Sequence, residues 1–112
     1  MLLDIEVAGD VGSIHVHGDV DVVEGPRLSD AAEKVLHEGV RRLVIDCRDV
    51  GFMDSSGLRA LLQVYQLAVS RGATMTLQRP SRFIYDLVQM VGLEHVMVVE
   101  GAPDEDGSAA PT

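Results

Sequence analysis

Two stretches near the start of the chain alternate apolar and polar residues, which is the period of a strand with one buried face. They cover residues 3–7 and 11–18, and a short turn at residues 8–10 separates them, so the pattern predicts a β-hairpin. The first stretch is expected to be half buried through Leu3, Ile5 and Val7. The second has an aliphatic face, with Ile14 and Val16, and a polar face, with Ser13, His15 and His17.

After the hairpin, helical and strand patterns alternate along the chain. Apolar residues spaced along one helix face predict three helices: between Gly25-Pro26 and Gly39, over residues 55–71, and between Pro80-Ser81 and Gly92. Strands are predicted at residues 43–45, 73–79 and 96–99, the first of them apolar throughout and therefore buried on both faces. This order predicts an α/β fold with a mixed sheet whose later strands are largely parallel.

Length, composition and charge narrow the class of protein. The 112 residues suffice for one domain, and the 46% that are hydrophobic include no Trp, so the core must be mainly aliphatic. The formal net charge is -9, from nine basic and eighteen acidic residues. This balance excludes a nucleic-acid binder, which needs a basic surface, and makes an anionic membrane surface an unsuitable partner.

The ends of the chain and its single cysteine bear on where the protein works. No apolar run is long enough to span a bilayer, and the N-terminus lacks the features of a secretory signal. Cys47 has no internal disulfide partner, which fits a reducing compartment, so we expect a cytoplasmic protein. From Gly101 the composition becomes small and polar, so residues 1–100 are expected to form the domain and residues 101–112 a disordered acidic tail.

The segment from Val50 to Leu58 carries the candidate chemistry. It connects the buried strand to the helix with the clearest apolar stripe, which consists of Leu58, Leu61, Leu62, Tyr65 and Ala68 or Val69. Functional residues in α/β sheets gather where strands end and helices begin, and Asp54, Ser55 and Ser56 lie at such a point. An Asp or Ser there can also simply cap the helix, and for Asp-Ser-Ser-Gly alone this interpretation is favoured.

Three functional interpretations compete with capping. A hydrolytic serine is disfavoured, since the Gly-x-Ser-x-Gly elbow is absent and no His is nearby in the sequence. A phosphate-binding loop would need glycine spacing and a lysine that the segment lacks. A serine modified by a kinase would gain roughly 1.5 to 2 negative charges, which a helix N-terminus tolerates.

The stretch Phe52-Met53-Asp54-Ser55-Ser56-Gly57-Leu58 closely resembles the phosphorylation motif of bacterial anti-sigma factor antagonists, the small single-domain members of the STAS family. Weaker resemblances lie at Gly18-Asp19-Val20-Asp21, residues 43–46, Arg79-Pro80 and residues 90–93. Together they cover residues 3 to 100, approximately. The resemblance implies the STAS fold, with one mixed sheet and helices packed mainly on one face.

The resemblance also implies a switch. Ser55 is then the residue phosphorylated by an anti-sigma factor serine kinase, an ATP-binding protein of the histidine-kinase-like ATPase type. The unphosphorylated antagonist binds this kinase and releases the sigma factor, phosphorylation ends the binding, and a Ser/Thr phosphatase resets the switch. The antagonist itself is then no enzyme and needs no cofactor. Asp21 and Asp54 match acidic positions beside the serine and are expected partner contacts.

Other residues of the segment complete the expected partner surface. They are Met53 in the loop, Ser56 and Gly57 in the motif, and Arg59 on the solvent side of the helix. The alternatives are a non-phosphorylated STAS scaffold or sensor subunit of a larger assembly and, in a different class, a small serine hydrolase. The scaffold would keep the fold without the switch, whereas the hydrolase would be labelled by a serine-reactive probe.

The histidines and the cysteine could in principle bind a metal ion or act as a nucleophile, but their positions favour structural roles. The spacing of His15 and His17 suits a metal ion, but His37 and His95 have no evident relation to them, so an exposed strand face is the favoured interpretation and no metal is predicted. Cys47 follows a buried strand and is expected to be a small buried residue rather than a reactive thiol.

Overall fold

The predicted hairpin forms one side of the sheet in the computed structural model, which describes residues 1–101 and 103. Strand β1 (Leu2–Ala8) pairs antiparallel with β2 (Val11–His17), and Ile14 and Val16 are buried as predicted. The predicted tail lies outside the described residues, apart from Gly101 and Pro103.

Strand β1 is more exposed than its alternating pattern predicted. The side chains of Ile5 and Val7 are 51% and 44% exposed, and of the three expected residues only Leu3 packs against the core. The reason is that β1 is the edge strand, while α1 (Gly25–His37) packs over β2 and β3 (Arg42–Asp49). Alternation marks which side chains share a face, but it does not show how far the helix layer extends.

The rest of the chain alternates helix and strand as predicted. The further elements are α2 (Ser55–Ser70), β4 (Thr74–Gln78), α3 (Arg82–Met90), a 3-10 turn η1 (Leu93–His95) and β5 (Val98–Glu100). The sheet has the order β1-β2-β3-β4-β5, and every pairing after the hairpin is parallel. The prediction of an α/β fold with one mixed sheet is therefore confirmed.

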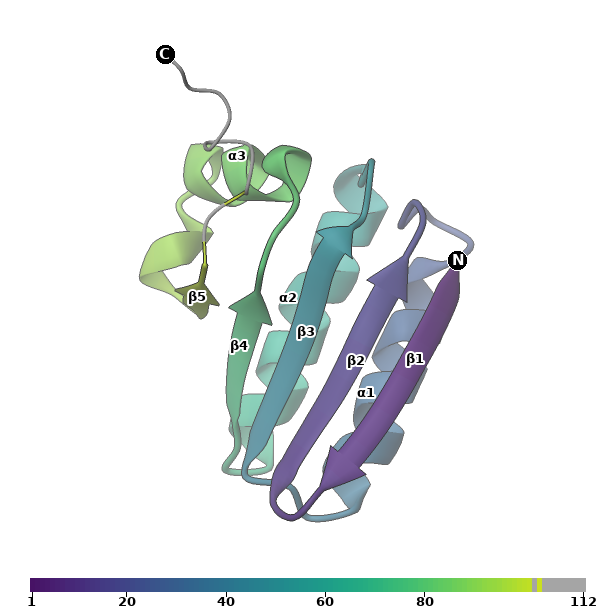
Figure 1. Ribbon diagram of the computed structural model, residues 1–112, viewed down its shortest axis with the longest axis vertical. Coiled ribbons are helices and arrows are strands. Elements are labelled where there is room, and N and C mark those ends of the chain that lie inside the picture. Colours follow the sequence, from purple (N-terminus) through teal and green to yellow (C-terminus); the bar gives the residue numbers. More distant parts are fainter. Residues whose placement is uncertain (102, 104–112) are drawn as a thin grey trace.

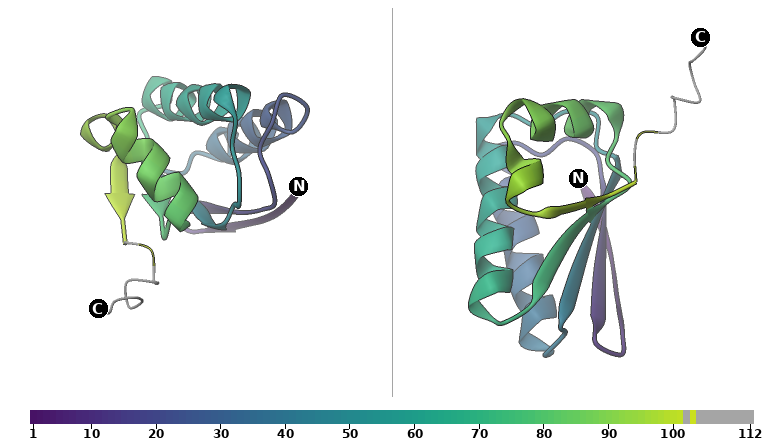
Figure 2. Two further views of the ribbon diagram at one scale, coloured as in Figure 1. Left: turned by 90° about the horizontal axis from the view of Figure 1, so that it is seen from above. Right: turned by 90° about the vertical axis from the view of Figure 1, so that its left-hand side faces the viewer.

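The helices α1 and α2 cover one face of the sheet, and no helix of the described chain lies over the other face (Figures 1 and 2). Helix α3 lies beyond the carboxyl end of β4 (Figure 1). The core between sheet and helices is aliphatic, with Ile14, Leu43, Ile45 and Leu77 fully buried. Among the described residues, no helix combines the length and the apolar character that a membrane crossing requires.

The buried side of α2 is rotated from the stripe predicted for it. Its buried residues are Gly57, Ala60, Leu61, Val64 and Ala68, whereas Leu58, Leu62 and Tyr65 are only partly buried and Val69 is exposed. Helix α2 packs on both the sheet and α1, and a Cβ added at Gly25 of α1 would lie 3.1 Å from the Ala60 Cβ. Small residues lie at the centre of this close contact between the two helices, and the larger residues of α2 flank it.

Candidate functional site

Two loops at the carboxyl ends of neighbouring parallel strands are joined through their backbones. Residues 18–24 connect β2 to α1, and residues 50–54 connect β3 to α2. The Val20 N–H donates to the Phe52 carbonyl at 3.0 Å, and the Asp54 N–H donates to the Val20 carbonyl at 3.4 Å. Val20 and Met53 form a parallel bridge, and both are buried. We call these two segments the paired loops, because they are held as one unit.

Asp54 caps helix α2 and fixes where Ser55 lies. The Asp54 backbone is extended, and its carboxylate accepts a hydrogen bond from the Gly57 N–H at 2.9 Å. This satisfies one of the unpaired N–H groups of the first turn. Ser55 is the first residue of the helix and is exposed. The capping interpretation is therefore correct for Asp54, and the cap leaves the neighbouring serine accessible.

Asp21 has a similar role in the other loop. Its half-buried carboxylate accepts hydrogen bonds from the N–H groups of Val23 at 3.0 Å and Glu24 at 2.9 Å. Its carbonyl accepts from the Gly25 N–H at 2.8 Å, where α1 begins. Both predicted acidic residues thus order the backbone of their own loops, and contact with a partner stays a prediction for each.

The structure corrects the expectation for Met53 and Gly57. The Met53 side chain is 4% exposed, so it belongs to the core and offers no surface to a partner. Gly57 is buried beneath the first loop, where an added Cβ would collide with the Val20 carbonyl oxygen and lie 2.6 Å from the Met53 Cγ. Both residues hold the paired loops in position instead.

Ser56 and Arg59 keep some surface. Ser56 is half buried, and Arg59 is exposed. Arg59 lies four residues after Ser55, on the same face of the helix and one turn along. The predicted solvent side of α2 next to the serine is therefore present.

Sequence reasoning missed an apolar surface beside the serine. Phe52 is 47% exposed and Phe83 at the start of α3 is 37% exposed, with ring centroids 5.5 Å apart. Val22 and Val23 in the first of the paired loops are also exposed. We call these four residues the apolar rim. Two of them are in contact and the other two lie on the adjoining loop, and exposed apolar side chains on neighbouring segments are typical of a protein-binding surface.

A side-chain link places α3 against this surface. The Ser81 hydroxyl donates to the Val50 carbonyl at 2.6 Å and accepts from the Ile84 N–H at 3.3 Å. It therefore caps α3 and also connects this helix to the second of the paired loops. The Ser81 N–H donates to the Cys47 carbonyl at 3.2 Å. Phe83 reaches Phe52 through this long-range contact, which no local pattern indicates.

The structure also bears on two candidate nucleophiles, a serine activated by a histidine and the thiol of Cys47. Within the described residues, no histidine hydrogen-bonds a serine hydroxyl; His15 and His17 instead lie against Asp49 and Asp4. Cys47 is buried as predicted, and burial, with a smaller contribution from the Asp46 charge, raises the pKa of its thiol far above the usual range. Neither observation supports nucleophilic catalysis.

The fold and the site define a class of domain: a mixed sheet with an N-terminal hairpin, helices on one face and an exposed serine where the second helix begins. The chain belongs to the STAS-domain family, since the family model described as "Mlab, STAS domain" matches residues 3–100. The sequence-based prediction of this family and fold is confirmed.

Individual relatives point in the same direction. The chain is 26% identical over 109 residues to the anti-sigma-B factor antagonist of Bacillus subtilis (strain 168), covering 96% of this chain and 98% of that protein. Its fold is similar to an anti-sigma factor antagonist from Mycobacterium paratuberculosis, with TM-score 0.78, 23% identity, and coverage of 96% and 92%. It is also similar to the Bacillus cell fate determinant SpoIIAA in its phosphorylated form, with TM-score 0.69, 19% identity, and coverage of 95% and 96%.

Proposed function

We propose that this protein is an anti-sigma factor antagonist that is switched by phosphorylation of Ser55. The unphosphorylated protein binds an anti-sigma factor that is also a serine kinase, and this binding releases the sigma factor. The observation that carries the proposal is the exposed Ser55 at the first position of a capped helix, beside the apolar rim. Relatives named as anti-sigma factor antagonists support it.

The position of Ser55 suits a switch that acts on the surface rather than on the fold. A phosphate there adds roughly 1.5 to 2 negative charges near a helix N-terminus, whose dipole favours anions. The Asp54 carboxylate already occupies the Gly57 N–H, so the new charge also meets a like charge. The fold survives, while the surface beside the exposed Phe52 ring becomes more strongly anionic.

The residues of the site divide the work. Asp21 and Asp54 order the paired loops and, together with Ser56, Arg59 and the apolar rim, contact the partner. The partner kinase supplies ATP and the catalytic base, and a Ser/Thr phosphatase removes the phosphate. The protein itself therefore acts by binding and performs no catalysis.

The direct test is incubation with an anti-sigma factor kinase and ATP, followed by mass spectrometry of the peptide that contains residues 54–56. We expect one phosphate, lost in Ser55→Ala and retained in Ser56→Ala. An unmodified peptide, with the kinase shown to be active on another substrate, would contradict the switch. That result would favour a non-phosphorylated STAS scaffold, for which light scattering would detect a large assembly.

A charge variant tests the consequence of phosphorylation. Ser55→Asp is expected to weaken binding to the anti-sigma factor at least about tenfold in calorimetry and to leave the melting temperature nearly unchanged. The control is Gln66→Glu, which adds a negative charge at an exposed position further along the same helix. A large fall in melting temperature for Ser55→Asp would mean that Ser55 is structural.

A further inference from the structure

The uncovered face of the sheet brings two histidines and two carboxylates together. His15 and His17 come from β2, with ring centroids 3.9 Å apart. The His17 Nε2 lies 2.9 Å from the Asp4 Oδ2 of β1, and the His15 Nε2 lies 2.8 Å from the Asp49 Oδ2 of β3. The second ring nitrogen of His17, Nδ1, lies 3.7 Å from the same Asp49 oxygen. Four side chains from three strands thus converge.

A bulge in β3 places Asp49 in this cluster. His15 is opposite Asp46 and His17 is opposite Asp49, so β3 advances three residues while β2 advances two. Strict alternation from Asp46 would send the Asp49 side chain to the helix side of the sheet. The extra residue returns it to the face of the histidines, as bulges commonly redirect a side chain.

We propose that Asp4, His15, His17 and Asp49 bind a divalent transition-metal ion of the zinc type. Imidazole nitrogen and carboxylate oxygen are the donors that such ions take. Ligand atoms of Asp4, His15 and His17 already lie within 4.8 Å of one another. Around a tetrahedral zinc ion, ligand atoms at about 2.0–2.2 Å from the metal are about 3.4 Å apart, so small side-chain movements suffice.

Neighbouring charges decide which groups are available. Asp46 is buried, and its carboxylate lies 2.7 Å from the Arg79 Nη2, so it is already neutralised and is no ligand. Arg48 competes with the ion, since its Nε lies 3.4 Å from the His15 Nε2 and 3.8 Å from the Asp49 Oδ2. The Arg48 side chain is 48% exposed and can turn into solvent when the ion binds.

The place of the cluster in the fold links it to the paired loops. The Gly18 N–H donates to the Asp49 carbonyl at 3.1 Å, at the point where both loops leave the sheet. The proposed ligands His17 and Asp49 directly precede these loops. The metal site does not depend on phosphorylation of Ser55, and its test is separate.

The experiment is a titration of the untagged, chelator-treated protein with Zn²⁺ in a calorimeter and with Co²⁺ by absorption spectroscopy. We expect about one ion per chain with a dissociation constant of about 10 μM or below. His17→Ala and Asp49→Asn should each weaken Zn²⁺ binding at least about tenfold. Arg48→Gln should strengthen it, because a competing positive charge is removed.

The control is the double variant His37→Ala/His95→Ala, whose two exposed histidines lie on α1 and η1, and it should bind as the parent does. A measurement on the unaltered protein covers the case of a variant that does not fold: Zn²⁺ should shift the NMR signals of the His15 and His17 rings and not that of His37. Absence of binding at about 100 μM Zn²⁺, or binding that persists in His17→Ala, overturns the proposal.

Discussion

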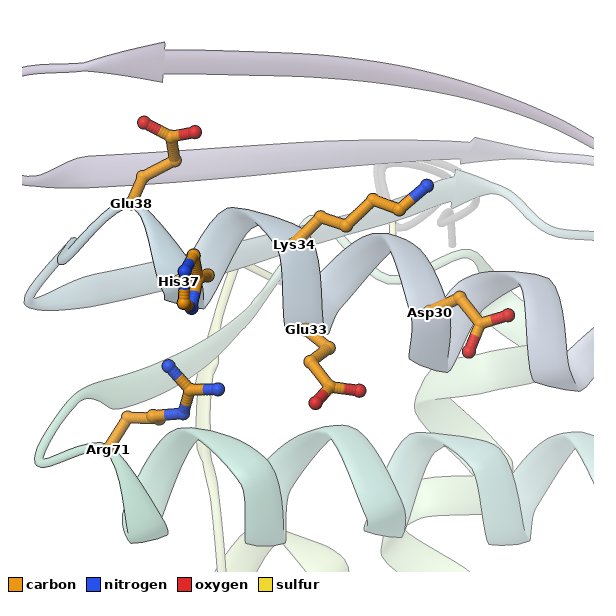
Figure 3. A pocket seen from close by; sticks show the side chains of 6 residues that line it. All are labelled: Asp30, Glu33, Lys34, His37, Glu38 and Arg71. Carbon is orange, nitrogen blue, oxygen red and sulfur yellow. The ribbon is translucent and has the colours of Figure 1, made fainter.

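The groove between the last turns of α1 and α2 is lined by exposed charged side chains, whereas the paired loops at the opposite end of these helices are held by buried contacts and hydrogen bonds. The groove has a volume of about 590 Å³ and is lined by exposed charged or titratable residues: Asp30, Glu33, Lys34, His37, Glu38 and Arg71. Figure 3 shows Glu33 and Arg71 pointing into the gap between the helices, while Lys34 and Glu38 point away from it. The paired loops are instead fixed in one arrangement by the bridge between the buried Val20 and Met53 and by the backbone hydrogen bonds that the Asp21 and Asp54 carboxylates accept.

The difference shows that a hollow is not by itself a site. Solvated charges rearrange at little cost, and exposed ion pairs are worth at most about 1 kcal/mol, so nothing in the groove fixes a ligand. In the paired loops the backbone is held by hydrogen bonds, and the exposed side chains include Val22, Val23 and Phe52. A surface of this kind suits a protein partner better than a small molecule.

The largest expected effect is a loss of stability at the point where the paired loops meet α2. Gly57→Ala adds a Cβ that collides with the Val20 carbonyl oxygen and the Met53 side chain, and we expect it to cost about 3 kcal/mol in urea unfolding. The matched control is Gly51→Ala, whose Cβ would lie 3.6 Å from the nearest such atom, Asp19 Oδ1, and should cost below about 1 kcal/mol. Equal costs would show that the loops are as adaptable as the groove.

The next effect concerns affinity. Phe52→Ala should weaken binding to the anti-sigma factor by about 2 kcal/mol, roughly thirtyfold, because exposed aromatic rings often carry most of the binding energy of an interface. The control is Val69→Ala, an exposed apolar position towards the far end of α2. Calorimetry measures both variants, and an unchanged affinity for Phe52→Ala would remove the apolar rim from the interface.

A smaller effect is expected for the helix cap. Asp54→Ala removes the acceptor of the Gly57 N–H and should cost about 1 kcal/mol of unfolding free energy. Asp54→Asn keeps an acceptor at the same place and should cost less. If both variants lose partner binding without losing stability, Asp54 contacts the partner directly and the cap is secondary.

Much of the fold follows from local patterns, because each helix and strand has its own periodicity. The exposure of Ile5 and Val7 does not, since it depends on where α1 lies over the sheet. The rotation of α2 has a similar cause: two packing partners, α1 and the sheet, choose which part of a broad apolar side is buried. Periodicity identifies an apolar side, and tertiary packing selects its centre.

The site divides in the same way. Ser55 and its cap follow from the residue types at a helix start, which act over a few neighbouring residues. The bridge between Val20 and Met53, the contact of Phe52 with Phe83 and the bulge that redirects Asp49 join segments distant in sequence. The burial of Met53 follows from that bridge, which is why its predicted role as a partner contact was wrong.

The smallest effect is expected in the groove. Glu33→Ala and Arg71→Ala should each change stability by less than about 0.5 kcal/mol, because both side chains are exposed and remain solvated without a partner. The double variant should show no coupling beyond the same limit, and the affinity for the anti-sigma factor should equal that of the parent. A tenfold loss of affinity in either single variant would place the groove in the interface, and the contrast between the two ends of the helix pair would then fail.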